Sequence, residues 1–245
     1  MPHAVIALDW MHTLSLGVFQ TWASLAMHSL VGVDGWQTGA TDITSRLTLS
    51  AYRLSADFQR WVRDANRGGR NLTEANNLKA EQFGTCKKPK FQLKGGETNS
   101  FLEYMLSFLP DRVAALGEDG ACVLQAGKHI FEILQIIRQY AKHPPASAIQ
   151  AMHSNAKSYL RIMGTLRVKP KPKGHMLIEL ASRMACLGSP QLYGCWHDEA
   201  LNKLLKEVAG GAHPMVHERR ILIQFPIAHD NDRAGRTTAK RRRTE

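Results

Sequence analysis

Apolar positions recur along most of the chain with the three- and four-residue spacing of α-helices. Over 13–31 they fall on one side of a predicted helix, and the glycine-containing turn 32–35 follows. A second helix is predicted to start at Asp42, a typical N-cap residue, and to end at the paired glycines of 67–70. We therefore predict two amphipathic helices in the first third of the chain.

The same spacing predicts helices in the rest of the chain. Their expected ranges are 97–109, ended by Pro110; 121–142, ended by Pro144 and Pro145; 146–163; 174–187; 197–209; and 214–225. The segment 71–94 is polar and weakly patterned, which predicts a surface loop with one short helix. The prolines and lysines of 168–173 predict an extended connector, because each proline fixes its own φ and restricts the residue before it.

The apolar run 4–8 contains the β-branched residues Val5 and Ile6 and predicts a short buried strand. That strand would end at Asp9, with His12 three residues later, and a rigid strand end is a suitable place for a metal-binding carboxylate. Alternatively, Asp9 is the N-cap of the helix that follows, and His12 lies in its first turn. The residues leave both interpretations open.

These patterns predict a mainly α fold, a multi-helix bundle with one short N-terminal strand. At 245 residues and 44% hydrophobic content, the chain can bury a substantial core. We predict a single helical domain over 1–227, with weak internal boundaries near 67–96 and 164–174. The range 228–245 is almost devoid of large apolar residues and is predicted to be a disordered basic tail.

The chain carries a formal net charge of +11, and its positive charge is clustered. The clusters are Lys87, Lys88, Lys90 and Lys94; Arg167, Lys169, Lys171 and Lys173; and Arg233, Arg236, Lys240, Arg241, Arg242 and Arg243. Such clusters can neutralise neighbouring phosphates, which predicts a polyanionic partner, DNA before an acidic membrane, bound non-specifically and salt-dependently. The alternative is that these lysines and arginines merely solvate loops and a tail.

Two of the clusters allow a more specific interpretation. The connector 169–175 leads into a helix N-terminus, so ammonium groups and backbone N–H groups would together suit a phosphate, unless the segment is only a stiff linker. The tail block 240–243 is typical of a nuclear import signal or a DNA-binding arm. We therefore predict a nuclear protein.

Several classes of protein are not indicated. The cysteines at 86, 122, 186 and 195 form no C-x-x-C pair, which favours reduced thiols in an intracellular protein. No apolar stretch has membrane-spanning length, so we expect a soluble chain without a membrane partner. Glycine-rich phosphate loops, nucleophile elbows and H-E-x-x-H motifs are absent, so nothing indicates a kinase, hydrolase or zinc protease.

Asp198 and Glu199 stand at the start of the predicted helix 197–209, where the helix dipole alone favours carboxylates. In a functional interpretation, one of these two carboxylates completes a metal site with Asp9. Two carboxylates can hold Mg²⁺ while it keeps several waters, as phosphoryl-transfer chemistry requires.

Three segments of the chain carry a family resemblance. The first is Asp9-Trp10-Met11-His12 with Leu16-Gly17-Val18, and the second is Leu93-Lys94-Gly95-Gly96-Glu97 with Phe101-Leu102 and the stretch 106–110. These two resemble segments of CACTA-type (En/Spm-like) DNA transposases, the first of them a D-x-M-H segment. The third, Lys171-Pro172-Lys173-Gly174-His175-Met176, is similar to a K-P-K-x-H segment of transposon-derived proteins. The resemblance extends over most of 5–225.

The resemblance implies descent from an RNase H-like strand-transfer enzyme whose acidic residues bind two Mg²⁺ or Mn²⁺ ions. Asp9 and His12 match as catalytic residues, and Glu199 is assigned as the last carboxylate, with Glu97 and Glu179 as competitors. An RNase H-like sheet needs several strands before this aspartate, and only eight residues precede Asp9. We therefore expect a C-terminal, helical part of a transposase-related protein.

The sequence thus predicts a transposon-derived DNA-binding protein that is not catalytic as an isolated chain and needs no cofactor. One alternative is an active strand-transfer enzyme that uses Mg²⁺ or Mn²⁺ on Asp9 and Glu199. The other is a helical scaffold whose apolar stripes bind a partner protein.

Overall fold

The computed structural model describes residues 8–85, 88–169 and 171–194, which belong to one compact unit. The predicted strand 4–8 lies outside these residues except for Leu8, which is in neither helix nor strand. The predicted helices 197–209 and 214–225, the boundary after 227 and the basic tail also lie outside them.

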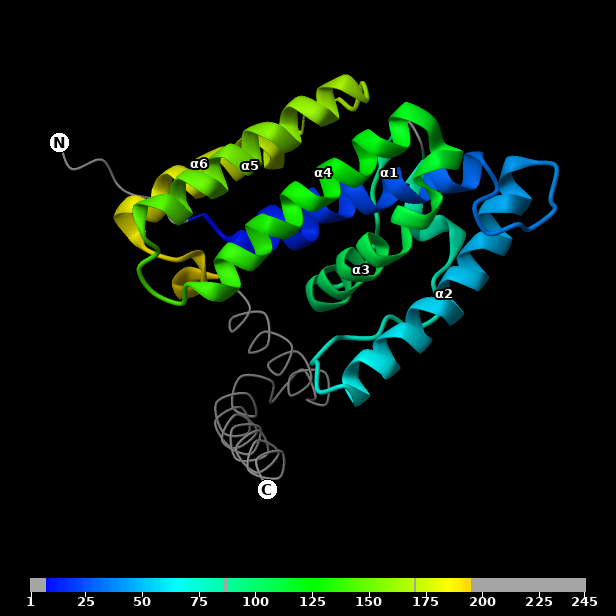
Figure 1. Cartoon of the computed structure of the whole chain (residues 1–245), viewed down its shortest axis with the longest axis horizontal. Coiled ribbons are helices and arrows are strands. Elements are labelled where there is room, and N and C mark those ends of the chain that lie inside the picture. The colour runs from blue at the N-terminus through cyan, green and yellow to red at the C-terminus, as the bar shows by residue number, and fades with distance from the viewer. Residues whose placement is uncertain (1–7, 86–87, 170, 195–245) are drawn as a thin grey trace, which may run out of the picture. The chain divides into compact units, whose positions relative to one another are not determined.

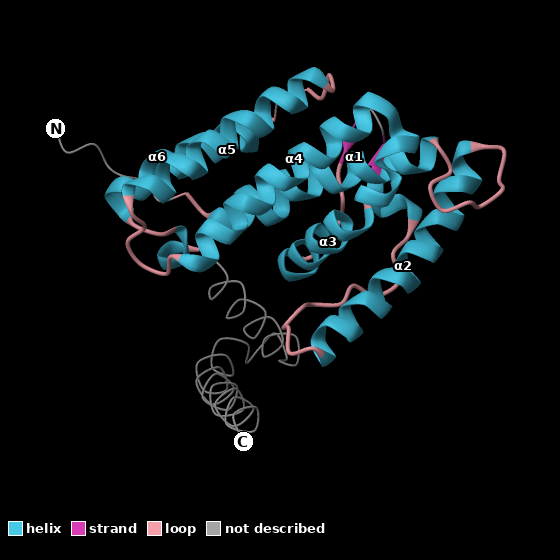
Figure 2. Cartoon of the chain, viewed as in Figure 1, coloured by secondary structure: helices cyan, strands magenta, loops and turns pink. Residues whose placement is uncertain are grey.

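The prediction of a mainly α fold is confirmed (Figure 2). The first helix begins as the π-helical η1 (Met11–Val18) and continues directly into α1 (Phe19–Gly32). The other α-helices are α2 (Ile43–Arg67), α3 (Gly95–Phe108), α4 (Val113–Gln139), α5 (Ala146–Thr165) and α6 (Pro172–Leu187). Short 3₁₀ turns are η2 (Ala80–Phe83), η3 (Pro110–Arg112) and η4 (Pro190–Tyr193). The strands β1 (Gly84–Thr85) and β2 (Lys88–Pro89) form one antiparallel hairpin, with Gly84 opposite Pro89. Among the described residues there is no RNase H-like sheet.

The continuous helix η1–α1 is the centre of this unit (Figure 1). Helices α2, α3 and α4 pack against α1, and α3 and α6 pack against η1. Phe19, Trp22 and Leu30 are fully buried, and polar residues of the same helix such as Ser24 are buried as well. The helix predicted over 13–31 is therefore present, but no residue in this range is exposed, and only Leu16, Leu25, His28 and Ser29 are half-buried.

Buried polar side chains on this central helix need hydrogen-bond partners, since an unpaired one costs about 1–3 kcal/mol. Gln20 Nε2 donates to the Leu93 carbonyl at 2.7 Å, and Trp22 Nε1 donates to the Val123 carbonyl at 2.8 Å. These bonds connect α1 to the segment before α3 and to α4. They fix how far α1 is shifted along its own axis, as well as its distance from these two neighbours.

The segment 71–94 is part of the core, which corrects the prediction of a surface loop. Leu78, Phe83 and Phe91 are buried, and the Phe83 and Phe91 rings stack with centroids 4.5 Å apart. Phe91 also packs against Phe101 of α3, 4.6 Å between centroids. Over 88–94 the buried Pro89, Phe91 and Leu93 alternate with exposed residues, a period of two that the helix-period analysis of this segment missed. Leu78 and Phe83 lie outside this alternation and were not distinguishable by spacing.

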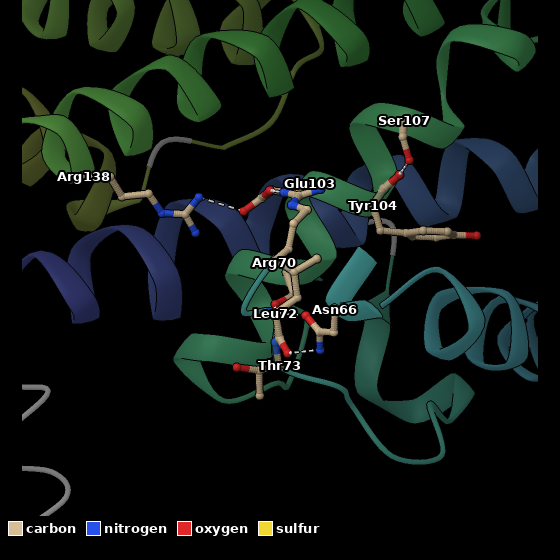
Figure 3. A network of polar contacts seen from close by, with 9 residues as sticks. Asn66, Arg70, Leu72, Thr73, Glu103, Tyr104, Ser107 and Arg138 are labelled. Carbon is tan, nitrogen blue, oxygen red and sulfur yellow. Dashed lines mark hydrogen bonds and ion pairs between the residues drawn. The ribbon is translucent and has the colours of Figure 1, made fainter. Parts of the chain in front are cut away.

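A buried carboxylate connects three parts of the chain (Figure 3). Glu103 of α3 has a side chain only 4% exposed and forms ion pairs with Arg138 of α4, at 2.7 Å, and with Arg70 in the segment after α2. Arg70 also lies over the Trp61 ring, 5.4 Å from its centroid. Since both guanidinium groups reach the solvent and only the carboxylate is buried, the ion pairs compensate for the desolvation of Glu103.

The predicted helix boundaries hold best where a capping residue marks them. Asp42 accepts a hydrogen bond from the Ser45 N–H at 2.8 Å and caps α2, as predicted. Pro110 ends α3 but also begins the turn η3, which leads directly into α4. Helix α4 starts earlier than the predicted 121 and is interrupted at Gly117, whose φ of 64° is not helical.

The crossing of α1 and α4 predicts an unusual glycine effect. A Cβ added at Gly127 would lie 2.3 Å from Trp22 Cζ2, so Gly127→Ala should destabilise the protein by about 1–3 kcal/mol despite alanine's higher helix propensity. Gly164 of α5 has open space around its added Cβ, and Gly164→Ala should stabilise by up to about 1 kcal/mol. Urea unfolding of both variants measures this. If both substitutions changed the free energy of unfolding in the same direction, the close α1–α4 packing would be contradicted.

Candidate anion-binding site

Two lysine clusters that are about eighty residues apart in sequence meet in the structure. Lys171, the residue before α6, donates from Nζ to the Pro89 carbonyl in β2 at 2.6 Å and to Thr21 Oγ1 of α1 at 3.2 Å. Lys90 follows Pro89 directly. The predicted connector therefore packs against both the hairpin and the central helix.

Lys173, in the first turn of α6, reaches the π-helical part of the same helix, N-terminal to Thr21. Its Nζ donates to the Leu16 carbonyl at 2.9 Å. Its aliphatic stem passes over Gly17, where an added Cβ would lie 2.5 Å from Lys173 Cδ. Only glycine at position 17 leaves room for this path, so the central helix and the lysine segment are matched in shape.

These lysines border a cavity of about 310 Å³ between η1–α1, α5 and the start of α6. Its apolar lining consists of Leu16, Val18, Tyr159, Leu160, Met163 and Val168. Its cationic lining consists of Lys90, Lys169, Lys171 and Lys173, and His175 also borders it. The cavity thus combines an apolar interior with a cluster of positive charge.

The positive charges lie close enough to repel one another. Burial lowers the pKa of Lys171, and the like charges of Lys90 and Lys173 lower it further. Burial and Lys90 also lower the pKa of Lys173, whereas the Asp9 carboxylate raises it. Among the described residues that line the cavity none is acidic, and Asp9 lies outside this lining, so an anion at this place would relieve the repulsion.

Asp9 has the geometry of a helix cap. Its carboxylate accepts hydrogen bonds from the backbone N–H groups of Met11 at 3.1 Å and His12 at 3.0 Å, and it also contacts His12 Nδ1. This is the arrangement expected from the N-cap interpretation. Within residues 8–85, 88–169 and 171–194, no group of three or more His, Cys, Asp or Glu side chains could hold a metal. Glu199 lies outside these ranges, so an Asp9–Glu199 metal pair stays a prediction.

The other predicted residues are not among those that line the cavity, or they lie outside the described parts. Lys88 is exposed in β2, and Lys94 is exposed before α3, 3.9 Å from Glu97 in a capping pair. Glu179 pairs with Arg183 along α6 at 3.7 Å. Outside the described residues lie Lys87, Lys240, Arg241, Arg242 and Arg243.

Sequence reasoning missed the wall of the cavity that α5 supplies. Tyr159, Leu160 and Met163 have the spacing of any core-facing helix stripe, and nothing in the sequence distinguishes a cavity wall from a filled core. Thr21 was likewise indistinguishable from other polar residues in the helix. The lysines were found because charge clusters are visible in sequence without knowledge of the packing.

Comparison with protein-family models, with curated proteins and with solved structures gave no match. Among the helices of the described residues, none combines the length and the apolar composition needed to cross a membrane. The site is therefore interpreted from its own geometry.

The mutual repulsion of the lysines can be measured directly. Lys90→Gln removes one like charge and should raise the pKa values of both Lys171 and Lys173, as followed by NMR titration of the lysine side chains. Lys128→Gln, on the exposed side of α4, is the matched control and should leave both pKa values unchanged. Unchanged values in Lys90→Gln would show that the three ammonium groups are not neighbours.

Proposed function

We propose that this protein binds DNA non-specifically through phosphate contacts to the surface formed by Lys88, Lys90, Lys169, Lys171 and Lys173, called here the lysine surface. The observation that carries the proposal is the meeting of Lys90 with Lys171 and Lys173. Two independent basic segments of the sequence contribute to one place, where charge repulsion must be offset by the fold. A phosphate backbone supplies the opposite charge in a continuous line.

The two kinds of lysine in this surface have different roles. Lys171 and Lys173 are held by hydrogen bonds to groups of the central helix and the hairpin, so they contribute a fixed positive field. Lys88, Lys90 and Lys169 are exposed and can adjust to phosphates. A fixed field with adjustable contacts and no base-reading groups favours binding that depends on salt and little on sequence.

The arrangement of the three transposase-like segments supports the same proposal. Asp9 to His12 lead into η1, Lys94 to Glu97 begin α3, and Lys171 to His175 begin α6. Helices α3 and α6 both pack against η1, so segments far apart in sequence gather around one end of the central helix. We therefore propose a transposon-derived, nuclear DNA-binding protein. Strand transfer would depend on Asp9 with Glu199 and is not part of this proposal.

A salt titration with a fluorescent duplex of arbitrary sequence tests the proposal. The affinity should fall steeply with salt, because each phosphate that a lysine neutralises releases counterions. The triple variant Lys88→Gln, Lys90→Gln, Lys169→Gln should reduce the slope of log K against log salt by about 0.9 for each phosphate that the protein no longer neutralises. Fluorescence anisotropy measures both the affinity and the slope.

The matched control replaces three exposed cations elsewhere: Arg63→Gln, Lys128→Gln and Lys142→Gln. It removes the same charge and should keep most of the parent slope. An equal decrease of the slope in both triple variants would attribute binding to net charge rather than to the lysine surface. No binding of the parent at low salt, or binding that ignores salt, would refute DNA contact altogether.

A further inference from the structure

We infer that the cavity inside the lysine surface is a binding site for a small amphipathic organic anion, a carboxylate with an unbranched hydrocarbon chain. This goes beyond DNA binding, because phosphate contacts need only exposed charge and do not require an apolar cavity. The cavity volume of about 310 Å³ lies at the lower end of the range for small-molecule sites.

The walls favour a flexible aliphatic body. Leu160, Met163 and Val168 contribute aliphatic groups, and Leu16 and Val18 close the side of the central helix. Among the described lining residues, the rings are that of Tyr159, which is only 3% exposed, and the exposed imidazole of His175. A nucleotide base is usually held by stacking on several exposed aromatic rings, whereas aliphatic side chains form most of the apolar lining here. The lining therefore suits a hydrocarbon chain better than a base.

The polar end of the ligand is specified by the ammonium groups. An ammonium group has three N–H donors, and within the described part of the chain Lys171 uses two of them and Lys173 one. Both ions therefore keep donors for a ligand while their positions are fixed. Lys90 and Lys169 border the same cavity and are exposed. A carboxylate at this place would pair with several ammonium groups while its chain enters the apolar interior.

A bound anion would also reduce the repulsion among these lysines. Part of the binding free energy thus comes from a charge cluster that folding has already assembled, and not from ordering flexible side chains. A hydrocarbon body without charge would gain only the apolar contacts. A charge without a hydrocarbon body would remain at the surface, where water screens it.

Isothermal titration calorimetry of the full chain with decanoate, below its micelle concentration and at low salt, tests the inference. We expect one site per chain. Acetate, which lacks the chain, and decyltrimethylammonium, which has the opposite charge, should each bind at least tenfold more weakly. Equal binding of decanoate and decyltrimethylammonium, or several decanoates per chain, would show unspecific surfactant adsorption and overturn the inference.

Variants locate the site. Gly164→Leu puts a side chain into open space at the cavity wall and should weaken decanoate binding at least tenfold, whereas Ala151→Leu, exposed on the same helix, should not. Lys90→Gln should weaken it severalfold without touching the walls. If Gly164→Leu and Lys90→Gln both bound decanoate with the affinity of the parent protein, decanoate would bind elsewhere and the inferred site would be refuted.

The proposal of DNA binding and the inference of a decanoate site can each be refuted without refuting the other. Gly164→Leu should leave duplex DNA affinity unchanged, and a chain that does not bind DNA could still bind decanoate. Single-stranded DNA that displaces decanoate where duplex DNA does not would assign the cavity to a nucleotide base and overturn the fatty-acid interpretation.

Discussion

The central helix, from Met11 to Gly32, is the constraint on which the rest of this structure depends, because most of its residues are buried, polar ones included. A buried polar side chain on this helix cannot turn to water, so it needs a partner, and several of these partners lie on neighbouring elements. Gln20 and Trp22 bond to backbone carbonyls before α3 and in α4, which fixes where those segments lie. The close approach of α4 at Gly127 follows from the same burial, since the Trp22 ring occupies the space of a side chain.

The lysine surface is built directly on this helix. Leu16 provides a carbonyl to Lys173, and Thr21 provides a hydroxyl to Lys171. Burial and like charge lower the pKa values of both lysines, so in the folded state they release protons at lower pH than in the unfolded chain. Their protonated forms therefore oppose folding near neutral pH, and this cost decreases as the pH rises through the folded pKa values. A fold that keeps such a cluster, rather than dispersing it, supports a role in binding anions.

The stability needed to hold this cluster comes from elsewhere in the unit. Glu103 joins α3 to α4 and to the chain after α2, and the stacked rings of Phe83 and Phe91 fill the space below the hairpin. The hairpin carries Lys88 and leads into Lys90, so the aromatic core of the irregular segment determines the position of the exposed cations. Structure and candidate function are thus connected through a segment that has little regular secondary structure of its own.

The sequence by itself determined the helices, since the three- and four-residue period and caps such as Asp42 are local signals, and it located the clusters of positive charge. Only the tertiary structure decided that the helix predicted over 13–31 has no exposed residue, that 71–94 contributes to the core, and that Lys90 meets Lys171 beside an apolar cavity. The physical reason is the range of the interactions. Helix formation depends on neighbours within four residues, whereas burial, cavities and like-charge contacts depend on segments that approach each other only after packing.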